Sequence, residues 1–128
     1  MGNQVTNIGG VLSAVTNTIA YTNSSAVTIG TVPAGAQIVD INIDVTTAFD
    51  AATTNTITVG KSGSAAAFVA ATDVDAAGRA SVATTGVYSA WADVGSADVS
   101  VTATYAQTGT AAAAGAARVT IVYRYPAP

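Results

Sequence analysis

The segment Thr31–Asp50 (TVPAGAQIVDINIDVTTAFD) carries the clearest hydrophobic pattern of the chain. After a Pro-x-Gly turn, apolar and polar positions alternate, and a period of two places alternate side chains on opposite faces of a strand. The set predicted to face the core is Val39, Ile41, Ile43 and Val45, and the set predicted to face water is Ile38, Asp40, Asn42 and Asp44. A shift of one residue would bury both aspartates, so the pattern predicts a half-buried strand of fixed register in an antiparallel sheet.

Similar short runs recur between turn residues along the rest of the chain, at the spacing typical of a β-sandwich or barrel. The predicted strands are Ala26–Thr31, Gln37–Thr46, Asn55–Gly60, Ala66–Ala70, Arg79–Ala83, Gly86–Ala92, Ala97–Ala106 and Ala117–Tyr125. Eight strands is the number of a jelly roll. The sequence therefore predicts an all-β, jelly-roll-like antiparallel sandwich. Its helical candidates are a short turn around Phe49 and the alanine runs at 65–67 and 111–114, of which the second is better interpreted as part of a loop, Thr108–Gly115.

Residues 1–24 differ from the remainder, because they lack a long alternating run and contain two adjacent glycines, Gly9 and Gly10. We interpret them as an N-terminal arm and residues 25–128 as the β-sandwich domain. The arm is predicted to add an edge strand over Ala14–Tyr21 or to lie on a neighbouring subunit, and a disordered tail is the alternative.

Composition narrows the classes of function. Half of the 128 residues are hydrophobic, 9% are charged, and the formal net charge is −3. Four dispersed basic residues do not make the clustered basic face that nucleic-acid binding requires. The chain has no histidine and no cysteine, which removes the commonest general base, the commonest metal ligand and all thiol chemistry. We also find no signal-peptide pattern and no run long enough to span a membrane.

Two groups of aspartates are candidate sites. Asp40 and Asp44 fall on one strand face about 13 to 14 Å apart, too far for a paired-carboxylate site, so they are predicted to be surface acids. Asp73-Val74-Asp75-Ala76-Ala77-Gly78 matches the first half of a calcium loop, but the chain has no glutamate to complete it. A turn is the favoured interpretation, and a calcium site completed by another subunit is the alternative.

Two further motifs bear on function. Gly60-Lys61-Ser62 resembles the end of a phosphate-binding loop but lacks the upstream glycine, so it is predicted to be a hairpin turn. Tyr88 and Trp91 lie three apart, so a strand would place one in the core and expose the other. The exposed ring could anchor a protein interface or stack on a sugar. No acid–base pair is evident, and the sequence predicts no enzyme and no cofactor.

The segment VPAGAQIVDINIDVTTAF, followed by TITVG and a C-terminal RVTIVYRY, resembles small proteins of tailed-bacteriophage structural modules, including head decoration (cement) proteins. The resemblance covers about residues 26–125. It implies a jelly-roll domain, often a homotrimer, on the outer surface of the head, where it braces adjacent major capsid proteins. It implies no catalytic, cofactor or metal residue. The possible interface residues are Tyr88, Trp91, Asp40 and Asp44.

Alternative functions remain open at this point. Another virion β-domain, such as a head fibre or a tail-associated domain, would occupy a different place in the particle. A carbohydrate-binding sandwich would use the exposed aromatics and would depend on calcium. We further hypothesise that the N-terminal arm carries much of the attachment to the head, because 24 extended residues reach far onto a neighbour at about 3.3 Å each.

Overall fold

The computed structural model describes residues 12–124, in which strands dominate the regular structure. The elements are β1 (Leu12–Ala20), β2 (Val27–Val32), β3 (Gln37–Thr47), β4 (Thr54–Lys61), β5 (Ser64–Asp73), β6 (Gly78–Arg79), the 3-10 helix η3 (Tyr88–Ala92), β7 (Val99–Thr108) and β8 (Ala116–Arg124). No helix in this part of the chain is long and apolar enough to cross a bilayer.

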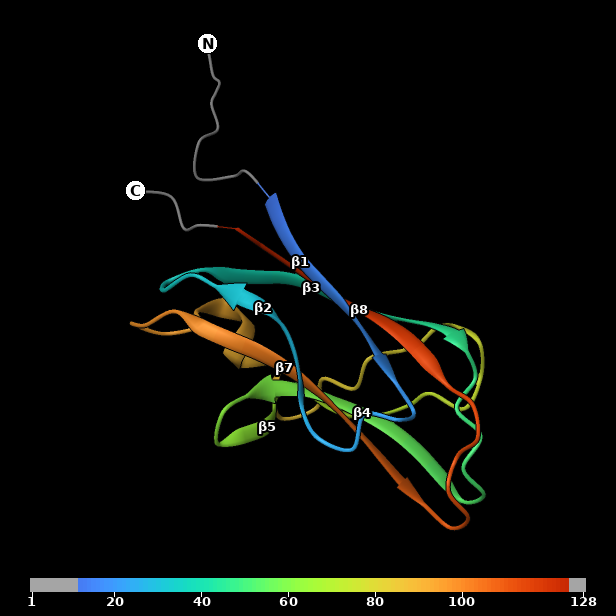
Figure 1. Cartoon of the computed structure of the whole chain (residues 1–128). Helices are drawn as coiled ribbons and strands as arrows, with labels where there is room; N and C mark the ends of the chain where they lie inside the picture. The colour runs from blue at the N-terminus through green and yellow to red at the C-terminus, as the bar shows by residue number, and fades with distance from the viewer. Residues whose placement is uncertain (1–11, 125–128) are drawn as a thin grey trace.

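The strands form two four-stranded antiparallel sheets packed face to face (Figure 1). Their orders are β1-β8-β3-β6 and β2-β7-β4-β5. The first strand therefore pairs with the last, the second with the seventh, the third with the sixth and the fourth with the fifth, as in one long hairpin wound into a sandwich. This is the arrangement of a jelly roll. The all-β sandwich of eight strands predicted from the sequence is confirmed.

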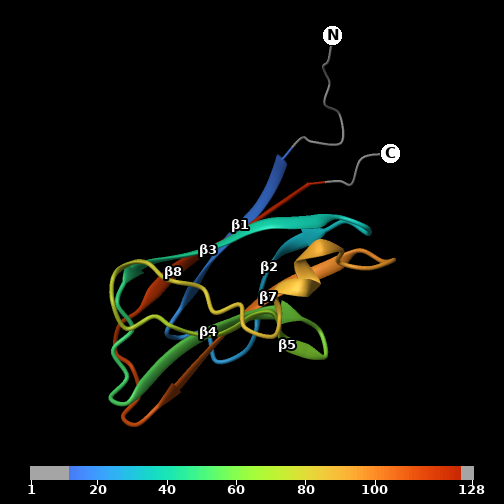
Figure 2. The ribbon, with the colours of Figure 1, turned by 180° about the vertical axis from the view of Figure 1, so that it is seen from behind.

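The core lies between the sheets and is built from inward-facing aliphatic residues and a few aromatic rings. Its largest fully buried side chains are Phe49, Phe68, Ile19, Ile41, Ile43, Ile57 and Ile121. Seen from behind, η3 lies at one end of the sandwich, near the first residues of β3 (Figure 2). Trp91 of η3 closes the core there, with only 6% of its surface exposed.

The alternation predicted for β3 is wrong at its first residues. Ile38 pairs with Tyr123 of β8 and Asp40 pairs with Val122, so Val39 is an extra residue in a β-bulge. The bulge shifts the side-chain phase, and Ile38 is consequently buried whereas Val39 is 44% exposed. The bulge lets Ile38 face the core on the same side as Ile41, Ile43 and Val45. A strictly regular alternation of side chains would leave Ile38 on the solvent face.

Two predicted strands between residues 79 and 92 are also wrong. Only Gly78–Arg79 forms a strand, and the predicted strand Gly86–Ala92 is replaced by η3. The N–H groups of Val87 and Tyr88 both bond to the Thr84 carbonyl, at 3.0 and 3.1 Å, which closes a turn before the helix. The helix points Trp91 into the core. The helical turn predicted around Phe49 is absent, since residues 48–51 have no regular structure.

The segment interpreted as an arm contains a strand. Leu12–Ala20 forms β1 and pairs with β8 over nine consecutive residues, from Leu12 opposite Arg124 to Ala20 opposite Ala116. Edge pairing was one of the alternatives for this segment. Residues 1–11 of the predicted arm lie outside the described residues, as does Tyr125, the last residue of the predicted strand Ala117–Tyr125.

Candidate interaction surface

The exposed large hydrophobic side chains of the described residues gather in one place. They are Leu12 of β1, Val39 of β3 and Tyr88 of η3, which are 56%, 44% and 63% exposed. All three line one hollow of about 340 Å³, together with Gln37, Ile38 and Arg124. We call this surface the apolar hollow. Scattered apolar residues on a surface are ordinary, but a cluster of them marks a site of interaction.

The fold positions each side chain of the apolar hollow. The β-bulge turns Val39 outward, and the register of β1 places Leu12 beside Arg124. The Arg124 Nε donates a hydrogen bond of 2.8 Å to the Gln37 Oε1. Apolar side chains therefore lie next to a polar rim that ties β8 to β3, and such a mixture is typical of protein interfaces.

Tyr88 and Trp91 divide between surface and core as the sequence predicted, but on a helix and not on a strand. Residues three apart lie on the same side of a 3-10 helix, so the two rings touch. Their centroids are 4.9 Å apart in an edge-to-face arrangement, and the Trp91 Nε1 donates to the Phe68 carbonyl at 2.8 Å. A buried, hydrogen-bonded Trp91 thereby holds an exposed Tyr88 in position. Both rings line a second hollow of about 200 Å³.

Asp40 and Asp44 lie four residues apart on β3, and Asp40 forms an ion pair within the sheet. The Asp40 Oδ2 lies 3.0 Å from an Arg79 nitrogen, and its Oδ1 accepts the Ile41 N–H at 2.9 Å. The Arg79 and Asp40 side chains are 62% and 44% exposed, so this ion pair contributes at most about 1 kcal/mol. Asp44 lies opposite Arg118 of β8 and Arg79 of β6 in the register of the sheet. The structure thus places Asp40 next to Val39 of the apolar hollow and Asp44 farther along β3.

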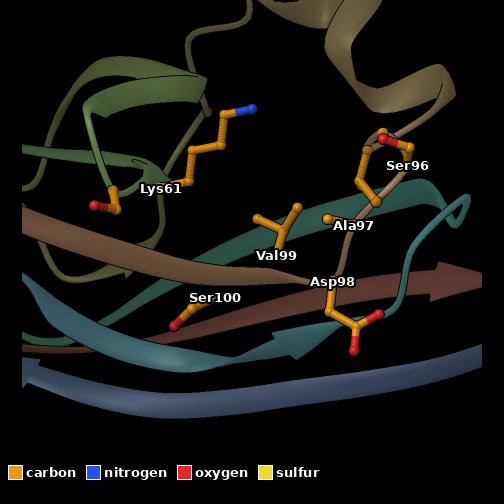
Figure 3. A pocket seen from close by; sticks show the side chains of 9 residues that line it. Lys61, Ser96, Ala97, Asp98, Val99 and Ser100 are labelled. Atoms are coloured by element: carbon orange, nitrogen blue, oxygen red, sulfur yellow. The ribbon is translucent and has the colours of Figure 1, made fainter.

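The calcium-loop motif of the sequence joins β5 to β6, and the phosphate-loop motif lies at the end of β4. No cluster of acidic, histidine or cysteine side chains that could hold a metal ion occurs between residues 12 and 124. The hairpin turn predicted at Gly60-Lys61-Ser62 is confirmed, with its turn residues at Ser62 and Gly63. Lys61 lines a hollow of about 430 Å³ with residues 94–100. Figure 3 shows the Asp98 carboxylate in this hollow pointing away from Lys61. That carboxylate accepts the Ala34 N–H at 2.9 Å and so serves the turn before β3.

A buried polar cluster was not found by sequence reasoning. The Asn55 Oδ1 accepts hydrogen bonds from the Tyr105 hydroxyl at 2.6 Å and from the Ala51 N–H at 2.9 Å, while its Nδ2 donates to the Ala51 carbonyl at 3.1 Å. The Tyr105 ring also packs on Phe49, with centroids 4.6 Å apart. The sign in the sequence was Asn55, which lies two residues before Ile57 in β4 and therefore on the same inward face. The cluster fixes the loop before β4.

Tyr105 gives the fold a dependence on alkaline pH. Burial, and secondarily the negative charge of Asp50, raise the pKa of this hydroxyl above 10.0. The unfolded chain loses the proton first as pH rises, so the contribution of Tyr105 is fully present below about pH 10 and falls as pH rises towards the higher folded pKa. We expect urea midpoints to fall above about pH 10, and to fall less in Tyr105→Phe. An equal alkaline decline in both proteins would contradict this assignment.

Comparison with known proteins gives two structural matches. No protein-family model and no curated protein sequence matches the chain. A chain in the capsid asymmetric unit of cyanophage Pam1 is similar in structure, with a TM-score of 0.72, 21% identity, and coverage of 98% of this chain and 93% of that chain. A chain in the acid-stable capsid structure of Helicobacter pylori bacteriophage KHP30 gives a TM-score of 0.60, 15% identity, and coverage of 94% and 92%.

These matches show a shared fold. Both alignments span nearly all of each chain, so the matched chains are also close to this one in length. The likeness therefore extends over the whole β-sandwich. Identity is low in both cases, and no residue role passes from those chains to this one.

Proposed function

We propose that this protein is a structural component of a bacteriophage virion that decorates the outer surface of the head and braces adjacent major capsid proteins. The observation that carries the proposal is the nearly full-length structural similarity to chains in two phage capsid structures. The resemblance of VPAGAQIVDINIDVTTAF and RVTIVYRY to decoration proteins supports the same role independently of the fold. A fold alone does not define a function, so the surface must supply the rest of the argument.

The surface favours binding over chemistry. Asp40, a candidate carboxylate of the sequence, accepts the Ile41 N–H and forms an ion pair with Arg79 within the sheet. The apolar hollow, by contrast, exposes three large hydrophobic side chains beside a polar rim. Its proposed occupant is the major capsid protein. In an oligomer mounted on a lattice, even weak contacts of this kind would hold the decoration layer, because the first subunit to bind raises the effective concentration of the subunits linked to it.

The role is tested on heads from a phage that encodes this chain, prepared with its gene deleted. We expect purified protein to rebind to the outside of these heads in a fixed small-integer ratio to the major capsid protein, measured by quantitative gel and particle reconstruction. The resemblance implies trimers in that reconstruction. Density confined to the tail or to a fibre would replace the proposal with one of those locations, and absence of binding would contradict a virion role.

The apolar hollow is tested by replacing its most exposed ring. Tyr88→Ala is expected to weaken head binding roughly 30-fold, as for a central interface aromatic worth about 2 kcal/mol. Occupancy measured against protein concentration gives this ratio. Tyr88 is 63% exposed, so the variant should fold normally.

Thr31→Ala is the matched control, because Thr31 is an exposed residue of β2 on the other sheet. It should bind like the parent protein. If Tyr88→Ala also binds like the parent to heads that are decorated on the outside, the virion role stands and the apolar hollow is not the contact surface.

A further inference from the structure

The four edge strands of the two sheets differ in how they are shielded. An exposed edge presents unpaired N–H and C=O groups, which proteins cover, bend or keep short. β6 has two residues, and β5 has two register irregularities and a hydrogen bond from the Ala70 N–H to the Ala83 carbonyl. β2 has a bulge between Thr28 and Gly30, and its Thr28 carbonyl accepts the Asn17 Nδ2. Each of these three edges is therefore short, irregular or partly hydrogen-bonded already, and so is poorly suited to pair with another strand.

β1 lacks these devices over its first half. Its sequence, LSAVTNTIA, has no charged residue and no proline, and its nine pairs with β8 show no register shift. Leu12, Ala14 and Thr16 are exposed. In Figures 1 and 2, the start of β1 lies at one end of the molecule, and β8 is the strand beside it.

Hydrogen bonds farther along β1 show which backbone groups face outward. The Thr18 N–H bonds to the Asn17 Oδ1 at 2.8 Å, and the Ala20 N–H bonds to the Asn23 Oδ1 at 2.7 Å. These N–H groups therefore point away from β8. Because N–H direction alternates along a strand, those of Leu12, Ala14 and Thr16 point the same way. Side chains therefore bind the outward N–H groups in the second half of the β1 edge. No side chain among residues 12–124 binds those in the first half.

We propose that this open edge binds the same edge of a second copy of the chain. The two β1 strands pair antiparallel about a two-fold axis, with Ala14 opposite Ala14 of the partner subunit and Leu12 opposite Thr16 of the partner subunit. This register uses all three outward N–H groups and all three carbonyls of each strand, giving about six backbone hydrogen bonds. It joins two four-stranded sheets into one continuous sheet.

The chemistry of the edge favours a second copy as its occupant. The same three positions supply donors and acceptors, so the edge is complementary to itself about a two-fold axis. Directly opposed side chains are about 4.5–5.5 Å apart at Cβ, and a small alanine meets another alanine at the centre without crowding. No charged residue occurs in β1, so the pairing brings no like charges together across the seam.

The contact is small, and we expect a weak dimer in solution with a dissociation constant on the order of 100 µM. The inference does not rest on the virion role, since it concerns the isolated protein. If the protein is mounted on a lattice, the same contact would link neighbouring copies.

The test is sedimentation of the full chain from about 10 µM to 1 mM, with two variants of one residue. Ala14→Lys places like charges opposite each other at the seam, and Ala14→Pro removes the central donor. Neither change disturbs pairing with β8, because the Ala14 N–H points away from β8 and its side chain is exposed. We expect the parent protein to shift from monomer to dimer mass, and both variants to remain monomeric.

Thr31→Lys, at an exposed position of β2, controls for added charge and should dimerise like the parent. Thermal melting of dilute samples checks that the Ala14 variants fold. A parent protein that stays monomeric at 1 mM, or an assembly of any size that both Ala14 variants leave unchanged, would overturn the proposal.

Discussion

Replacing Trp91 with alanine is expected to lower the free energy of unfolding by about 3–5 kcal/mol, the range found when a buried aromatic residue is truncated. The ring is 6% exposed and closes one end of the core, and its Nε1 bonds to the Phe68 carbonyl at 2.8 Å. Its removal leaves a cavity and an unpaired carbonyl, and it also removes the ring on which Tyr88 packs. Urea denaturation followed by circular dichroism measures the change.

Two milder variants separate these contributions. Trp91→Phe keeps most of the apolar volume but lacks the donor, so it should cost about 1–3 kcal/mol for the unsatisfied Phe68 carbonyl. Tyr88→Ala alters only the exposed ring and should change stability by less than about 0.5 kcal/mol. If Trp91→Ala cost no more than Tyr88→Ala, η3 would not be part of the core.

The second large effect is expected from Gly60→Ala in β4. A Cβ atom there would overlap the Ser64 carbonyl oxygen and would lie 2.5 and 2.6 Å from the Ala65 carbonyl carbon and oxygen. These are backbone atoms, so no rotamer change relieves the overlap and the β4–β5 hairpin must open. We expect a loss of about 3 kcal/mol, the upper end of the usual cost of overpacking, measured by thermal and urea unfolding.

Gly63→Ala is the matched control in the same hairpin. Gly63 has φ +81° and nothing within 4 Å of an added Cβ, so alanine there costs only the left-handed backbone conformation, about 1 kcal/mol. Equal losses in the two variants would show that the strands do not approach closely at Gly60.

Local patterns predicted the β-sandwich because each strand has one face towards solvent and one face towards the core. Val99, Val101, Ala103 and Tyr105 alternate with polar residues, and all four are buried in β7. Side chains two residues apart lie on the same face of a strand, so these four residues share the face that packs in the core. The strand predicted over Gly86–Ala92, where the apolar pattern was weak, was wrong. The chain forms η3 there, which buries Trp91 and packs the Tyr88 ring against it, whereas an extended chain would place the two rings on opposite faces.

The candidate surface was predictable only in part. Tyr88 and Trp91 were chosen from residue type, since large aromatics at low abundance have either a packing or a binding role. Leu12 and Val39 were not, because their exposure follows from long-range pairing. Val39 is exposed by the bulge opposite Tyr123 of β8, and Leu12 reaches the same hollow because the first strand of the chain pairs with the last. The adjacent apolar residues Ile38 and Val39 were the sign in the sequence that the alternation of inward and outward side chains shifts by one residue.

By itself, the sequence determined the class of fold, the absence of histidine and cysteine chemistry, and the uncharged character of the segment that becomes β1. These are properties of residue type and of spacing along the chain. Only the tertiary structure decided that three distant hydrophobic side chains share one hollow and that the first half of β1 is an open edge. The reason is physical: exposure and edge position depend on which strands pair, and that pairing is set by burial over the whole sandwich, which no local window contains.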